Sequence, residues 1–506
     1  MEIFKEDIHI TETLLDESLS CVTEADIIVP DTMPDILKVL KCDIDLIKTD
    51  KIVHQNGVEF SGVLDYKILY LADDKTVRAI NYNRDFSRNV DAKIEGDVVC
   101  YVNGDVTHIE PKVSNSRKLN VKDVVSLKVK IIKQNTVSAV TGYDGDEYPV
   151  KMQKTNSFSL NVCKDAKIKV EDVLDLNLLT NGADEILKVN FLVKDTELKS
   201  VANKAVARGT VKIDALYTYE NEIMSFEYEI PFSEIIEAEG LEPDMYSNGE
   251  LKVIDSSYDI AEDGNMNVSV DVNVNIRAYI ENSYETVADT YSPDYELELP
   301  RFNATVSEMI DVNSVQTVVK DSFITENEIE KVYFVSGKPY AESVKISGNK
   351  AEISGYIDAS VMYKASENSK DATVNCEQKQ IPFTSQVQLS RNCDDGVCEY
   401  SVSADGETYT LSGENSCDLR FVVRCEARVI KNNSVSLITD VICDESKKID
   451  KSNQAGIIVY FVQQGDTLWD VAKHYNTTDK QIIEVNNLLK EYKPEVGDRL
   501  VIPKTV

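Results

Sequence analysis

Apolar and polar residues alternate along three short stretches of the chain, each of which runs from a glycine to a tyrosine. The stretches are 62–70, 209–217 and 355–363. In each, the second, fourth, sixth and eighth residues after the glycine are apolar or aromatic, and the third and fifth are polar. This period of two is typical of a β-strand with one buried face, and antiparallel partners can leave the other face in water. We therefore predict a half-buried strand in each stretch.

The three stretches belong to an internal repeat. Their glycines lie 147 and 146 residues apart. An acid-Ile-x-Lys-Val motif precedes each stretch, and its isoleucine lies 26, 23 and 26 residues before the glycine. Phe86, Phe232 and Phe383 follow the stretches, and each copy closes with a further alternating segment. Evenly spaced landmarks in one order predict homologous domains, which we place at residues 1–150, 151–300 and 301–445.

The first copy departs from the other two at one landmark. It has Arg84-Asp85 before the phenylalanine, where the second and third copies have Ile-Pro. We expect a loop at this point of the chain, and the sequence leaves the conformation of that loop in the first copy undetermined.

The last fifty residues have a different pattern. A polar linker at 446–456 leads into a module at 457–504, in which short apolar runs near each end predict strands. Thr467 with Asp470, and Thr478 with Gln481, stand at the spacing of capping boxes and predict two helix starts. The module therefore reads as β-α-α-β. Its predicted core residues are Leu468, Val471, Ala472, Ile483 and Ile502.

The predicted fold class is mainly β, with three tandem β-rich repeats followed by this small module. The repeats are sandwich-like or barrel-like, and the sequence does not choose between the two. Oligomeric state and the contact surfaces of the repeats are also open.

Composition narrows the range of partners. The chain has 54 Lys and Arg against 88 Asp and Glu, a net charge of −34. Such a field repels nucleic acid and anionic lipid, and favours solubility or a basic protein partner. Ten scattered cysteines form no CxxC pair, so we expect reduced thiols rather than a zinc site or a disulfide framework. The start of the chain does not read as a signal peptide, and no apolar run is long enough for a membrane span.

Motifs for catalysis are missing from the sequence. It contains no GxxxxGK[ST], HExxH or GxSxG motif, and its four histidines stand apart from one another. Pairs of carboxylates are expected by chance among so many acids. We therefore expect no enzymatic activity, no cofactor and no metal.

The terminal module resembles the LysM domain. The matching motifs are Gly465-Asp466-Thr467-Leu468-Trp469, Val471-Ala472, Asn486-Asn487-Leu488, Gly497-Asp498 and Leu500-Val501-Ile502-Pro503. The resemblance implies a binding module, most often for N-acetylglucosamine glycans such as peptidoglycan. It also implies a groove between two loops, lined by Gly465, Asp466 and Thr467 on one side and by Asn487, Leu488 and Leu489 on the other. The alternative is that these residues only shape a turn, cap a helix or fill a core.

The repeats resemble the SPOCS domain of sporulation proteins. The matching features are Pro34-Asp35-Ile36, the glycine-to-tyrosine strands, the Pro-Phe pairs and Arg117-Lys118-Leu119-Asn120-Val121. Three such domains followed by one LysM domain resemble the SipL-type family of spore coat morphogenetic proteins. This resemblance implies a scaffold, located in the mother-cell cytoplasm at the forespore surface or spore coat. Its LysM module would bind the coat morphogenetic ATPase, and its repeats would tether the coat to the forespore surface, with other coat proteins as further candidate partners.

A cell-wall or cortex protein that binds peptidoglycan is the alternative. The module is nearly neutral, with six basic and seven acidic residues over 456–506, and its aromatic residues are Trp469, Tyr475 and Tyr492 besides those of the first strand. Few aromatic platforms for sugars and a cytoplasmic location both favour a protein partner. Nucleic acid and a transmembrane segment are not expected.

Overall fold

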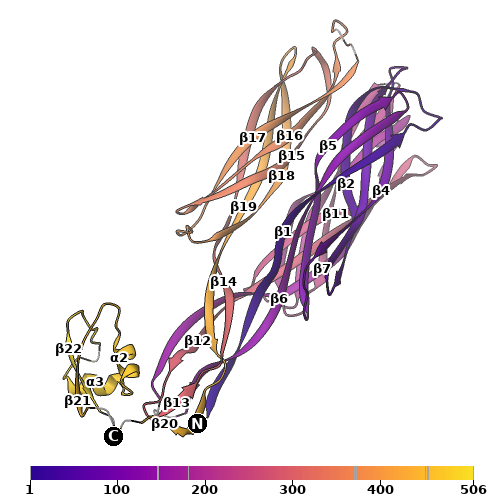
Figure 1. The fold of residues 1–506 in the computed structure, drawn as a ribbon. Coiled ribbons are helices and arrows are strands. Elements are labelled where there is room, and N and C mark those ends of the chain that lie inside the picture. The colour runs from indigo at the N-terminus through magenta and orange to yellow at the C-terminus, as the bar shows by residue number, and fades with distance from the viewer. Residues whose placement is uncertain are drawn as a thin grey trace.

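The strands predicted from the period-two pattern are the central strands of small sheets, and the chain repeats one arrangement of sheets three times (Figure 1). The structure, a computed structural model, describes residues 2–144, 148–180, 182–220, 222–369, 371, 373–450, 452, 455–489 and 491–504.

Each repeat contains six long strands. The first has β1 (Ile3–Ile28), β2 (Ile36–His54), β3 (Gly57–Ala72), β4 (Val77–Asp91), β5 (Val98–Asn115) and β6 (Lys118–Tyr143). The second has β7 (Val150–Asp175), helix α1 (Leu176–Thr180), β8 (Glu185–Val201), β9 (Lys204–Tyr219), β10 (Glu222–Glu237), β11 (Tyr246–Ile260) and β12 (Asn265–Thr290). The third has β14 (Arg301–Ile324), β15 (Ile329–Ser347), β16 (Lys350–Ala365), β17 (Val374–Gln388), β18 (Val397–Gly413) and β19 (Ser416–Ile438).

The remaining elements are short. Strands β13 (Tyr295–Glu298) and β20 (Ile442–Lys448) pair with each other, so the beginning of the expected linker is in a strand. The terminal module has β21 (Ile457–Phe461), α2 (Leu468–His474), α3 (Asp479–Val485) and β22 (Arg499–Pro503), in the expected β-α-α-β order.

Every repeat is a sandwich of two three-stranded antiparallel sheets. The sheet orders are β1-β6-β5 with β2-β3-β4, β7-β12-β11 with β8-β9-β10, and β14-β19-β18 with β15-β16-β17. Leu64, Tyr66 and Ile68 of the central strand β3 are at most 1 % exposed and belong to one apolar cluster with residues of β6. The mainly β fold is confirmed, and the repeats are sandwiches rather than barrels. The domain boundaries themselves remain predictions.

The repeated glycine has a packing role. Its cross-strand partner is a phenylalanine in each repeat: Gly62 pairs with Phe86, Gly209 with Phe232 and Gly355 with Phe383. A Cβ at Gly209 would lie 2.8 Å from the Phe232 ring, so the ring covers the position that a side chain would take. The phenylalanine lies within β4, β10 or β17, so residues 84–86 are in a strand, and the loop expected in the first copy is absent.

The strand register corrects one sequence landmark. Lys41 and Lys188 lie opposite Leu69 and Leu216, which are equivalent residues, so Lys188 corresponds to Lys41. The acid-Ile-x-Lys-Val motif of the second copy is therefore displaced by three residues. This displacement explains why its isoleucine lies 23 rather than 26 residues before the glycine.

Long strands extend beyond the sandwiches and form a stalk. Figure 1 shows β1, β6, β12 and β14 running from the sandwiches toward the end of the molecule where the N-terminus and the terminal module lie. Apolar side chains from all three repeats pack together along this stalk. Val140, Val287 and Ile438, one from each repeat, are 0 % exposed and share one cluster.

The sandwiches meet around a pseudo-threefold axis. Each repeat contacts the next through the same pair of structurally equivalent positions, but the residue types at those positions differ from one contact to the next. Arg78 binds Glu185 (2.7 Å), the Lys331 ammonium contacts the Met224 sulfur (3.3 Å), and Lys38 donates to Asn375 (2.7 Å). The last contact joins the third repeat to the first, so the ring of three repeats is closed.

The polar face of the small sheets lies inside this ring. Asp43 of β2 binds Lys188 of the second repeat and lies 3.4 Å from Lys41. Lys41 in turn donates to Ser336 (3.2 Å) and Ser360 (2.6 Å) of the third repeat. Burial would raise the pKa of Asp43, but the two ammonium groups outweigh it and lower that pKa. The face that an antiparallel sheet can leave in water is here an interface between repeats.

Candidate partner-binding site

The terminal module has an apolar core of its own. Val471, Ala472, Ile482, Leu500 and Ile502 are at most 4 % exposed and pack in one cluster. Leu468 is half-buried against this cluster, as expected. The prediction that Ile483 is a core residue is wrong, because its side chain is only half-buried. Ile482 takes that place, because the helix begins after Thr478 and turns position 482 inward.

Both predicted helix starts are present. Thr467 accepts a hydrogen bond from the Asp470 amide (3.2 Å). Thr478 accepts one from the Gln481 amide (3.2 Å), and the Gln481 side-chain oxygen accepts one from the Thr478 amide (3.2 Å), which completes a capping box.

The first loop of the expected groove is held by local contacts. Gly465 has φ +92°, which side-chain-bearing residues rarely adopt. Asp466 accepts hydrogen bonds from the Tyr460 hydroxyl (2.6 Å) and the Gln463 amide (2.8 Å), which lower its pKa. With Thr467 as helix cap, all three residues have a structural role.

The three residues of the second loop differ from one another. Asn487 is exposed and has φ +51°. Leu488 is half-buried against the core of the module. Leu489 is 83 % exposed, which leaves a large apolar side chain in solvent. The groove remains a prediction, and Leu489 is its one residue with a mostly exposed apolar side chain.

Further apolar residues lie at the surface of the module. Ile457, Val459 and Phe461 alternate along β21 and are 71, 48 and 60 % exposed, on the face of the small sheet turned away from the core. Val496, in the loop after α3, is 70 % exposed. Ile457, Val459 and Phe461 thus form one row of exposed apolar side chains along β21.

Asn486 links the second helix to the last strand. Its side-chain amide donates to the carbonyl groups of Ile482 (2.8 Å) and Val501 (2.7 Å), and accepts from the Val501 amide (2.8 Å). The sequence motif contained this residue, but its role depends on packing between α3 and β22.

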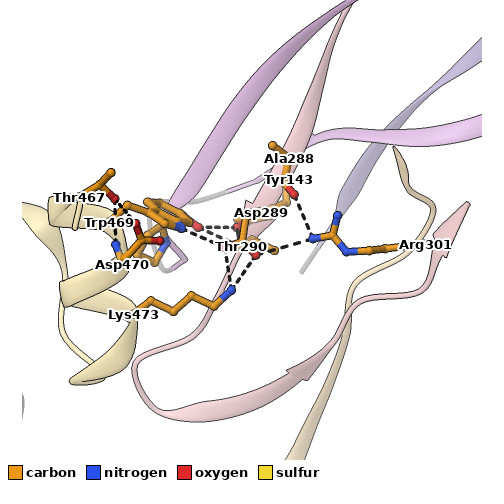
Figure 2. A network of polar contacts seen from close by, with 10 residues as sticks. Tyr143, Ala288, Asp289, Thr290, Arg301, Thr467, Trp469, Asp470 and Lys473 are labelled. Carbon is orange, nitrogen blue, oxygen red and sulfur yellow. Dashed lines mark hydrogen bonds and ion pairs between the residues drawn. The ribbon is translucent and has the colours of Figure 1, made fainter. Parts of the chain in front are cut away.

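Sequence analysis missed the contact between the module and the repeats. Figure 2 shows Trp469 and Lys473 of α2 converging on Asp289 near the end of β12. The Trp469 indole donates to Asp289 (2.9 Å), and the Lys473 ammonium donates to both of its carboxylate oxygens (2.8 and 2.7 Å). Partial burial would raise the pKa of Asp289, but the bonds from Lys473 and Trp469 outweigh it and lower that pKa.

Tyr291 completes the contact. It is 6 % exposed and belongs to the apolar cluster of the terminal module, although it follows a strand of the second repeat. Its ring meets that of Trp469 edge to face at 5.0 Å, and its hydroxyl donates to the Thr477 carbonyl (2.8 Å). The three aromatic side chains considered as platforms for a sugar therefore all have contacts within the chain. Trp469 contacts Tyr291, Tyr475 contacts Tyr460 at 5.8 Å, and the Tyr492 hydroxyl binds Asp498.

Within the described ranges, no three His, Cys, Asp or Glu side chains are placed to hold a metal ion. The helices that the structure describes are all too short or too polar to span a bilayer.

Two family models match the chain. One, described as SipL, SPOCS domain, matches residues 35–114, 183–261 and 328–412. The other, the LysM domain, matches residues 460–503. No curated protein and no solved structure matches it.

Each SPOCS match begins at the second strand of a sandwich and ends with the fifth. The LysM match covers the β-α-α-β module. These domains indicate a sporulation protein that carries a peptidoglycan-binding-like module, and both are domain types that bind or adapt rather than catalyse. The chain therefore has the SipL-type architecture, with three SPOCS domains followed by one C-terminal LysM domain.

Proposed function

We propose that this protein is a non-enzymatic adaptor in endospore coat assembly. Its LysM module binds the coat morphogenetic ATPase, and its three β repeats tether coat proteins to the forespore surface. This role places the protein in the mother-cell cytoplasm, against the forespore. The observation that carries the proposal is the exposed apolar surface of the LysM module, above all Leu489 at 83 % exposure.

An apolar surface fits a protein better than a sugar. Burying aliphatic side chains yields binding energy in proportion to the area removed from water. A glycan presents hydroxyl groups and is gripped by stacking on aromatic rings together with hydrogen bonds. Trp469 already contacts Tyr291 and Asp289, so this indole is engaged within the chain. These contacts favour a protein partner.

Peptidoglycan binding is the second candidate, and the domain type supports it. Gly465, Asp466, Thr467 and Asn487 would then contact the sugar through their backbone and side-chain polar groups. The two candidate functions differ in the ligand that the module binds, so one set of variants, assayed with each ligand, tests both.

The experiment compares Leu489→Arg with Lys480→Glu. Lys480 is an exposed residue of α3, so its substitution changes charge without removing apolar surface. The purified full-length chain is mixed with the coat ATPase, and separately with insoluble peptidoglycan, and the bound fraction is measured.

We expect the Leu489→Arg chain to lose at least ten-fold in affinity for the ATPase, and the Lys480→Glu chain to bind like the wild type. Neither chain should sediment with peptidoglycan. Unchanged ATPase binding by a folded Leu489→Arg chain would count against the proposed surface. Peptidoglycan binding without ATPase binding would favour the second candidate.

A further inference from the structure

The foot of the stalk carries a site that faces the LysM module. Its central residue is Asp289, whose carboxylate takes three hydrogen bonds from α2. The two donors, Trp469 and Lys473, stand four residues apart and therefore share one face of the helix. One carboxylate thus grips one helix face through an indole and an ammonium group.

The site is held in place by all three repeats. Thr290, next to Asp289, donates to the Pro149 carbonyl (2.8 Å) and contacts the Tyr143 hydroxyl of the first repeat. Arg301 of the third repeat donates to the Ala288 carbonyl (3.0 Å) and lies 3.8 Å from the Asp289 carboxylate. Figure 2 shows Arg301 approaching Asp289 and Ala288 from the side opposite Lys473. The segment is thus held by contacts that do not involve the module.

Tyr291 adds an apolar anchor. It is buried among LysM residues, with its ring against Trp469 and its hydroxyl on the Thr477 carbonyl. A large aromatic side chain that leaves one domain to fill the core of another is typical of a specific interface.

We propose that Asp289 and Tyr291 form a docking socket that fixes the orientation of the LysM module on the stalk. The socket holds the α2 face of the module and leaves the exposed side chains of Ile457, Phe461 and Leu489 free. A ligand bound to the module then has a fixed orientation relative to the three repeats, because the module does not reorient on a flexible linker.

The test needs no partner, because Trp469 is the only tryptophan in the chain. Its fluorescence therefore comes from one indole, which lies at the contact between the module and the stalk. The quenching constant for acrylamide and the emission maximum are measured on full-length chains that carry Asp289→Ala, Lys473→Ala or the control Glu285→Ala. Glu285 is an exposed residue of β12, so the control removes the same charge from the same strand.

We expect both Asp289→Ala and Lys473→Ala to raise the quenching constant at least two-fold and to shift emission to longer wavelength. Glu285→Ala should match the wild type. Because Lys473 is a surface residue of α2, its variant keeps the stalk intact and separates undocking from misfolding. If either variant at the contact leaves the quenching constant at its wild-type value, the socket does not hold the module and the proposal is overturned.

Discussion

Trp469 belongs to the LysM motif and also joins the LysM module to the repeats. It is the last residue of the motif Gly465-Asp466-Thr467-Leu468-Trp469, and the helix start at Thr467 places it on the first turn of α2. Its indole is then committed to Asp289, 180 residues earlier in the chain. An aromatic ring that would suit a sugar is instead part of an internal contact.

The residue-level predictions succeed where a local rule decides. Thr467 and Thr478 cap helices because the cap needs only a hydroxyl three residues before an amide. Ile482 and Ile483 were harder to separate, because both are apolar and a one-residue change in helix phase exchanges their positions. Asp289 could not be predicted, since nothing in its local sequence marks it as the partner of a helix near the C-terminus.

The difference between the two isoleucines is measurable. Ile482→Ala should lower the free energy of unfolding of the LysM module by about 2–5 kcal/mol, because it leaves a cavity in a fully buried site. Ile483→Ala, at a half-buried position, should cost about 1 kcal/mol or less. Urea unfolding followed by Trp469 fluorescence checks both. Equal losses in the two variants would contradict the assigned helix phase.

At the scale of elements, the central strands β3, β9 and β16 were the most predictable parts of the fold. Alternation identifies their buried face, and the repeated glycine, which is the sixth residue of each strand, pairs with a phenylalanine of the neighbouring strand. The polar face was not predictable. Ser360 reads as a residue in water, but it accepts a hydrogen bond from Lys41 of the first repeat inside the ring. A period of two does not distinguish solvent from the polar face of a neighbouring repeat.

The repeated glycines should differ in their tolerance of a methyl group. At Gly355 a Cβ would lie 2.0 Å from the Tyr340 carbonyl oxygen, which belongs to the backbone of the neighbouring strand. At Gly62 the nearest atom is 3.0 Å away, in the flexible Leu46 side chain. Gly355→Ala should therefore cost about 1–3 kcal/mol and Gly62→Ala clearly less. Thermal unfolding of the two full-length variants tests this order, and a larger loss at Gly62 would contradict it.

At the scale of the whole molecule, the period near 146 residues predicted three copies of one domain, and the structure repeats one set of sheets three times. The ring closure was not predictable. The equivalent contacts Arg78–Glu185, Met224–Lys331 and Asn375–Lys38 use an ion pair, a sulfur and an amide, so no shared motif marks them. The family model also stops short of the first and sixth strands, which build the stalk.

The interior of the ring should make stability depend on pH. Glu407 of β18 is mostly removed from water, and this burial, with Asp214 and Glu227 of the second repeat nearby, raises its pKa to about 7. An acid with a raised folded-state pKa binds its proton more tightly when folded, so stability falls as pH rises from the unfolded value of about 4.3 to about 7. Lys212 and Lys41 offset only part of this effect.

Glu407→Gln removes the charge and keeps the shape. We expect it to stabilise the protein by about 1–3 kcal/mol at pH 8 and by less at pH 5. Glu414→Gln, at an exposed turn of the same repeat, is the control and should change little at either pH. Urea unfolding at the two pH values gives the comparison. A stabilisation by Glu407→Gln that is the same at both would show that burial of this charge is not the cause.

The central claim is that the LysM module, which lies at the end of the stalk below the ring of three repeats, binds a protein. The most direct measurement is photo-cross-linking in sporulating cells, with a benzophenone amino acid at position 489 and a control at position 480. The account predicts that position 489 cross-links to the coat ATPase and that position 480 does not. Cross-links from position 489 to no protein, or equal cross-links from both positions, would contradict it.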